Sequence, residues 1–153
     1  MDDTRMMILE LGSKGYSCAQ IVVTGGLRLL GRDNPDLVRA MAGLGQGVGC
    51  SGEICGALSG GVCLIAMHTA KGMDSEDTLP ECQPLMNGLV EWFREEQCQG
   101  GPLTCDALLG AGGAASGTMN PQICGNLVAA VWTRAVNMLL EQGIDPVQGR
   151  ELP

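Results

Sequence analysis

Apolar residues recur along this chain at every third or fourth position, which is the spacing of one buried face of an α-helix. The segment 84–97 shows this most clearly, because Leu85, Leu89 and Phe93 fall on one side of a helix. No stretch alternates apolar and polar residues as a half-buried strand does, and no repeat of fixed period occurs. The pattern predicts an all-α fold, a single compact helical domain of about six or seven helices with glycine-rich loops.

Start and stop signals set the ends of these helices. Ser17, followed three residues later by Gln20, fits a capping box, while Asn34-Pro35 and Asn120-Pro121 each join a capping residue to a proline suited to the first helical position. The predicted helices cover residues 3–11, 18–30, 35–42, 55–71, 84–97, 105–109 and 121–142. Glycine-rich loops at 43–52 and 110–117 and an acidic linker at 73–81 join them. The core then spans about residues 4–143, and the C-terminal tail is irregular.

Aromatic residues are scarce, with two Trp, one Tyr and one Phe, so the core must be built from Leu, Ala, Val, Met and Gly. Gly56, Ala57, Gly60 and Gly61 give the predicted helix 55–71 a face of very small residues. Such a face lets another backbone, or a bound cluster, approach the helix closely.

The formal net charge of −8 argues against non-specific binding to nucleic acid or anionic lipid, which requires a basic surface. The first residues lack the basic and apolar regions of a signal peptide, and the longest apolar stretch, 54–67, is too short to span a bilayer. We therefore expect a cytoplasmic protein with no membrane span and no nucleic-acid partner. Disulfide frameworks are rare in that compartment, so eight cysteines indicate metal or redox chemistry.

Four of the cysteines each lie at a predicted helix start: Cys18, Cys55, Cys105 and Cys124. The first N–H groups of a helix have no partner within it, and the helix dipole there favours negative charge. A cysteine in that place loses its proton more easily, and the thiolate is the form that attacks, exchanges or binds metal. If the four helix starts converge, the sequence predicts a pocket of activated sulfur.

The cysteine spacings point to a site assembled from separate helices. No C-x2-C occurs, which removes the usual zinc-finger, thioredoxin and bacterial ferredoxin patterns. Cys50 precedes Cys55 by five residues and is ambiguous, because a loop residue beside glycines can turn its sulfur inward or leave it exposed. Soft thiolates select zinc, cuprous copper or an iron–sulfur cluster.

The remaining cysteines and the single histidine are given structural roles. Cys63 is read as a small apolar core residue, and Cys82 and Cys98 as surface thiols near helix ends. His68 is expected at a partly exposed helix position, not as a ligand. The segment 47–52 matches G-x-G-x-x-G by letter, but no strand precedes it, so it is interpreted as a loop that allows close backbone approach.

Four short elements in order resemble a known family. The segment 55–60, CGALSG, fits the CGAxxG core of the C_GCAxxG_C_C family of redox-active proteins. The segments 17–20 (SCAQ), 104–110 (TCDALLG) and 123–128 (ICGNLV) resemble its other three cysteine elements. The resemblance covers about residues 17–140 and implies a redox site on the four cysteines already named. A similar module in split-Soret cytochromes is associated with an iron–sulfur centre, but no C-x-x-C-H for a c-type haem is present here.

Three hypotheses follow from these observations. In the first, Cys18, Cys55, Cys105 and Cys124, with Cys50 as substitute, hold an iron–sulfur cluster that passes electrons to a redox protein partner, which the acidic surface predicts to be basic. In the second, the same cysteines form a metal-free thiol–disulfide redox protein. In the third, the chain is a non-catalytic helical module with structural zinc or buried cysteines, whose small-residue faces serve a homodimer.

Overall fold

The computed structural model describes residues 2–110, 113–117 and 119–150. Within these ranges it holds seven α-helices: α1 (Asp3–Ser13), α2 (Cys18–Leu29), α3 (Pro35–Met41), α4 (Gly56–Thr69), α5 (Cys82–Trp92), α6 (Cys105–Leu109) and α7 (Ile123–Glu141). A 3-10 turn (Ala42–Leu44) follows α3, a π-helical turn (Phe93–Gln97) extends α5, and a second 3-10 turn (Ala114–Ser116) precedes α7. Pairing of extended segments is limited, in the described residues, to one isolated antiparallel bridge between Ile54 and Thr104. The all-α prediction is confirmed.

The helix ends agree with the capping residues that the sequence shows. The side chain of Asn34 accepts a hydrogen bond from the Leu37 N–H, and Gln20 accepts one from the Ser17 N–H. α7 begins two residues later than predicted, yet Asn120 still accepts the N–H of Ile123 and so caps it. α5 begins two residues earlier than predicted, at Cys82, and its last predicted turn is π-helical.

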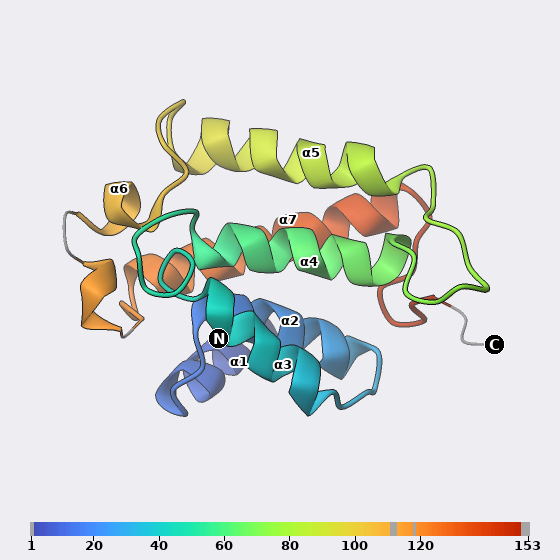
Figure 1. Cartoon of the computed structure of the whole chain (residues 1–153), viewed down its shortest axis with the longest axis horizontal. Helices are drawn as coiled ribbons and strands as arrows, with labels where there is room; N and C mark the ends of the chain where they lie inside the picture. The colour runs from blue at the N-terminus through green and yellow to red at the C-terminus, as the bar shows by residue number, and fades with distance from the viewer. Residues whose placement is uncertain (1, 111–112, 118, 151–153) are drawn as a thin grey trace.

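α4 is the central element, packed against α2, α5 and α7 (Figure 1). Its glycines allow these crossings, because a Cβ added to Gly60 would lie 3.0 Å from the Ala19 Cα of α2. A Cβ on Gly61 would lie 2.3 Å from a methyl carbon of Val131 in α7. The buried core around α4 contains two aromatic residues, Phe93 and Trp132, and otherwise aliphatic and sulfur-containing side chains. The prediction of a small-residue face for close helix approach is thus confirmed.

The C-terminal segment lies against the end of α4, and this overturns one expectation. His68 is only 1% exposed, and its ring nitrogens lie 2.9 Å from the Leu64 carbonyl oxygen and 3.0 Å from that of Pro146. Arg150 donates to the carbonyls of Thr69 and Ala70. The expectation that His68 is partly exposed is wrong, because the irregular tail covers it.

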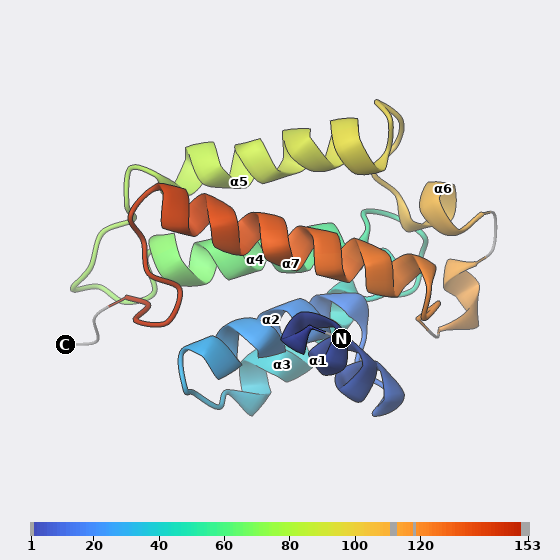
Figure 2. The same cartoon turned by 180° about the vertical axis from the view of Figure 1, so that it is seen from behind.

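α7 runs the length of the molecule beside α4 (Figures 1 and 2). In the described part of the chain it is the one helix long and apolar enough to cross a membrane by length and composition. Core helices of folded proteins pass the same test, and α7 buries Val128, Val131 and Leu139 in the core shared with α4.

Candidate functional site

The four cysteines singled out from the sequence do lie at helix starts. Cys18 and Cys105 are the first residues of α2 and α6, Cys55 is the N-cap of α4, and Cys124 is the second residue of α7. All four are buried and carry free thiols. Figure 1 shows these helix starts gathered at one end of the molecule, beside the loop that precedes α4.

Glycines of α4 bring Cys18 beside Cys55. A Cβ on Gly56 would lie 3.5 Å from the Cys18 Cβ and 3.1 Å from the Leu44 carbonyl oxygen. One turn later, Gly60 lies against the backbone of Ala19, so α2 and α4 start from nearly the same point. The small face of α4 therefore sets the distance between two of the candidate residues.

A short antiparallel pairing of segments 53–55 and 103–105, called the clip below, holds the backbones of Cys55 and Cys105 together. The Cys55 N–H donates to the Leu103 carbonyl (2.9 Å), and the Cys105 N–H donates to the Glu53 carbonyl (2.7 Å). The bridge between Ile54 and Thr104 lies between these two bonds. The sequence analysis missed this pairing. Its only signal is that both cysteines follow a β-branched residue, which favours extended backbone.

Cys18 and Cys124 form a hydrogen-bonded thiol pair. The Cys18 side chain donates to the Cys124 sulfur, which lowers the pKa of Cys124 from its ordinary 9.0 to about 7. The same bond, together with burial and the neighbouring Cys55 and Cys105, raises the pKa of Cys18 far above its ordinary value. Of the two thiols, Cys124 therefore loses its proton first, while Cys18 keeps its own proton and donates it in the hydrogen bond.

The other two thiols are harder to ionise. Burial raises the pKa of Cys55 to about 11, although its sulfur accepts the N–H groups of Leu58 and Ala57, which act in the opposite direction. Burial also raises the pKa of Cys105, and the negative charges of Cys124 and Asp106 raise it further. Of the four thiols, Cys124 is therefore the one whose pKa is lowered, chiefly by its bond with Cys18, whereas at Cys55 and Cys105 burial outweighs the helix start.

Cys50 lies in a loop of unusual backbone conformation. The φ angles of five consecutive residues, 46–50, are positive: 48° at Gln46, 74° at Gly47, 62° at Val48, 61° at Gly49 and 60° at Cys50. Left-handed backbone costs a non-glycine residue about 1–2 kcal/mol, so three such residues mark a strained turn. Cys50 is exposed, and its charge acts on Cys105.

Two glycines of this loop, Gly47 and Gly52, allow close backbone approach, as the interpretation of segment 47–52 predicted. A Cβ on Gly47 would lie 2.5 Å from the Glu53 backbone, and one on Gly52 would lie 2.3 Å from the Asp106 carboxylate. The Asp106 N–H also donates to the Gly52 carbonyl (3.1 Å). The loop is thereby fastened to α6, next to Cys105.

The remaining cysteines belong to other surroundings. Cys63 is half-buried and packs against Ala19, Val23 and their neighbours, in agreement with its predicted core role. Cys98 is half-buried at the end of the π-helical turn. Cys82 is 3% exposed, so its prediction as a surface thiol is wrong, because α5 already begins there and turns it inward.

The sulfurs do not converge on one point. Among the residues described, no three His, Cys, Asp or Glu side chains stand together as ligands of a single metal ion. The four thiols instead come from the starts of four helices, and each influences the ionisation of at least one of the others.

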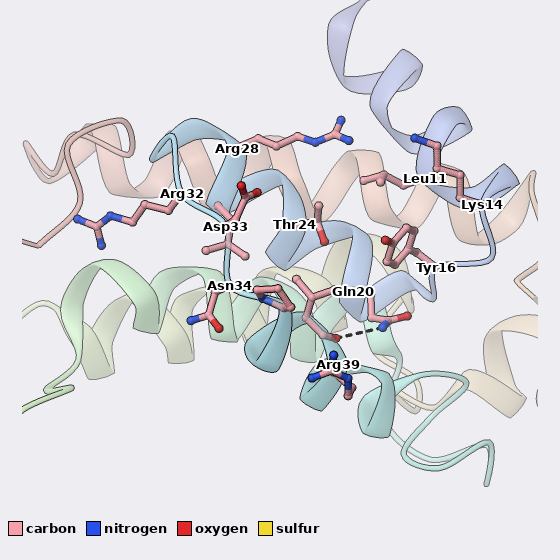
Figure 3. Close-up of a pocket in the computed structure, with 13 residues that line it drawn as sticks. Leu11, Lys14, Tyr16, Gln20, Thr24, Arg28, Arg32, Asp33, Asn34 and Arg39 are labelled. Atoms are coloured by element: carbon pink, nitrogen blue, oxygen red, sulfur yellow. Dashed lines mark hydrogen bonds between the residues drawn. The ribbon is translucent and has the colours of Figure 1, made fainter.

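One large cavity lies away from the cysteines. It has a volume of about 640 Å³ and lies among α1, α2 and α3 (Figure 3). Its basic side chains are mostly neutralised, because Lys14 and Arg28 both pair with Glu10 and Arg39 pairs with Asp36. It therefore offers no obvious connection to the sulfur chemistry.

Comparison with known proteins gives one match. The family model described as "Putative redox-active protein (C_GCAxxG_C_C)" matches residues 16–138. That range covers the four candidate cysteines at the helix starts and the loop before α4. No curated protein and no solved structure matches the chain.

Proposed function

This chain belongs to the C_GCAxxG_C_C family of redox-active proteins, and we propose that it is an electron-transfer protein whose buried cysteines hold an iron–sulfur cluster. The ligands would be Cys18, Cys55, Cys105 and Cys124, with Cys50 as the substitute for one of them. When bound, such a cluster supplies a centre that accepts one electron and gives it up again.

The observation that carries the proposal is the gathering of four buried thiols from four separate elements at one end of the molecule. Cysteines that serve only as packing residues do not need to lie close to one another. A site whose ligands are far apart in sequence does require the fold to bring its cysteines together. The thiolates that hold an iron–sulfur cluster are divided among two or more irons. The sulfurs therefore do not need the single point of convergence that one metal ion demands.

The surroundings of the thiols fit an anionic, sulfur-ligated group. The Ala57 and Leu58 N–H groups already donate to the Cys55 sulfur, and such bonds stabilise negative charge on sulfur. Ionising one thiol raises the pKa of the next. Four thiolates can coexist here only with positive charge between them, which bound iron would provide.

The acidic surface at this end supports a basic redox partner. Glu53 and Asp106 are exposed on either side of the Cys55–Cys105 clip, and exposed Cys50 lies on the same loop as Glu53. A protein with lysines around its own redox centre would be attracted to this end by long-range electrostatics.

The Cys18–Cys124 pair supports a second candidate, a metal-free thiol–disulfide protein. The Cys124 thiolate would attack a disulfide of a partner protein, form a mixed disulfide and release one partner thiolate. Cys18, giving up its proton, would then attack the Cys124 sulfur and release the second partner thiolate. The products are a Cys18–Cys124 disulfide and a reduced partner dithiol, and the low pKa of Cys124 is the specific observation that favours this route.

Anaerobic purification or reconstitution, followed by a visible spectrum and iron, sulfide and zinc analysis, tests the proposal. Cys105→Ser is the informative variant, because its clip can stay hydrogen-bonded while the ligand is lost. Cys63→Ser, a half-buried thiol of α4 outside the site, is the matched control.

We expect matched iron and sulfide in the wild type and in Cys63→Ser, and loss of both in Cys105→Ser. A colourless, metal-free wild type after reconstitution would refute the cluster, and turnover of a protein disulfide that depends on Cys124 would then support the second candidate. Stoichiometric zinc without iron would refute both and indicate a structural role.

A further inference from the structure

A second cavity, of about 610 Å³, lies on the outer face of α7. The first residues of α1 and Trp92 at the end of α5 form its sides. Figure 2 shows α7 crossing the front of the molecule, with α5 on one side and α1 on the other. Its volume is in the range of about 300–1,000 Å³ typical of small-molecule sites.

Two arginines without a partner line this groove. Five of the nine basic residues of the chain form ion pairs within the described residues, and Arg5 and Arg134 are not among them. The Nε atom of Arg134 is buried and has no hydrogen-bond partner in the described structure. A buried charged donor left unpaired costs free energy that an anion would recover.

The groove also has an apolar part. Ala129 and Ala130 of α7, with their small side chains, and the half-buried Trp92 of α5 line it. An aromatic ring prefers to stack on another ring or lie against small apolar groups. A planar ring of one or two fused cycles matches such a lining better than an aliphatic chain does.

Polar side chains follow this apolar part along the same face of α7. Asn126, Thr133 and Asn137 line the groove, and within the described chain their side chains have no hydrogen-bond partner. Amide and hydroxyl groups can donate to or accept from the edge of a heterocycle. Asp2 at the rim is already engaged, because it accepts the Arg5 N–H (2.9 Å) and caps α1.

From these features we propose that the groove binds a mononucleotide-like anion, with its planar ring between Trp92 and the alanines of α7 and its phosphate between Arg5 and Arg134. Cys124 faces the core on the opposite side of α7, where it meets Cys18. The groove is therefore a separate site from the cysteines, and its binding test does not depend on the proposed redox function.

Trp92 provides the reporter for the test. A Trp132→Phe background leaves Trp92 as the only indole, and calorimetric titration of the unaltered 153-residue chain checks that background. The probes are AMP and UMP, with adenosine as a ring without charge and inorganic phosphate as a charge without a ring. Arg5→Gln, at an exposed position, and Arg134→Gln remove the anion contacts. Arg32→Gln removes an arginine that also forms no ion pair but lies in the other cavity.

We expect saturable quenching of Trp92 by at least one nucleotide, with a dissociation constant about tenfold or more below those of adenosine and phosphate. Arg5→Gln and Arg134→Gln should each raise that constant about fivefold or more, while Arg32→Gln leaves it within about twofold. Three results would overturn the proposal: no saturation by either nucleotide, phosphate binding as tight as nucleotide binding, or equal weakening in Arg32→Gln. If Arg134→Gln does not fold, Arg5→Gln alone decides.

Discussion

The hydrogen bond from Cys18 to Cys124 makes a sharp prediction about thiol ionisation. In the reduced, metal-free protein the pKa of Cys124 is about 7, so near neutral pH about half of it is thiolate. Replacing Cys18 by Ala removes the donor, which is the largest cause of the lowering, and leaves burial opposed by backbone hydrogen bonds, so the pKa should return toward 9.0. A full return to 9.0 would lower the thiolate fraction of Cys124 at neutral pH to about one hundredth.

The size of this effect decides the assay. A thiolate of higher pKa is the better nucleophile, with a Brønsted slope of about 0.4–0.5, so the alkylation rate falls only about sixfold while the thiolate fraction falls about fiftyfold. Ultraviolet absorbance of the thiolate, followed against pH under anaerobic conditions, therefore resolves the change better than reaction rates do. Subtracting the titration of Cys124→Ser isolates the step that belongs to Cys124.

The control and the refutation are both direct. Cys63→Ala removes a thiol that packs elsewhere, and it should keep the step near neutral pH. If Cys18→Ala also keeps that step, the Cys18 donor is not what stabilises the Cys124 thiolate. The backbone N–H groups at the start of α7 would then be responsible, and the account of the Cys18–Cys124 hydrogen bond would be wrong.

Three further predictions test the scaffold of the site. Gly61→Ala places a Cβ against Val131 and should lower the unfolding free energy by about 1–2 kcal/mol in denaturant titration, with partial recovery when Val131→Ala is added. Gly52→Ala should lower both cluster loading and stability more than Gly49→Ala does. Both glycines have positive φ, but only at Gly52 would the added Cβ collide with a neighbour, the Asp106 carboxylate. Equal effects of the two substitutions would show that this contact does not hold the loop against α6. The pKa of Cys55 is raised to about 11, so the protonated thiol stabilises the fold fully below pH 9.0, and this contribution is lost as the pH rises toward 11. Wild-type protein should therefore lose up to about 3 kcal/mol of unfolding free energy over that range because of Cys55. Cys55→Ala should not show this part of the loss when unfolding is measured against pH.

The fold could be read from the sequence because its signals are local. Helical periodicity, the caps at Ser17, Asn34 and Asn120, and the glycines of the segment 56–61 each act within a few residues, and each led to a feature that is present. The four candidate cysteines were found for the same reason, since a helix start is a local feature.

What the sequence could not provide were the long-range contacts and the balance of opposing effects. The burial of His68 depends on Pro146, which lies 78 residues further along the chain. The pairing of the Cys55 and Cys105 segments is equally remote in sequence. The pKa directions also could not be predicted, because a helix start lowers the pKa of a thiol and burial raises it, and only the folded surroundings decide which prevails.

The candidate site is assembled from both halves of the chain. Cys18 and Cys55 lie before the acidic segment 73–81, and Cys105 and Cys124 lie after it. A single protease cut in that segment would leave two fragments, each with two of the four candidate cysteines, joined by the packing of α4 on α7 and by the Ile54–Thr104 clip. Neither fragment could rebuild the site alone. Recovery of the site from mixed fragments would therefore measure how well the two halves recognise each other.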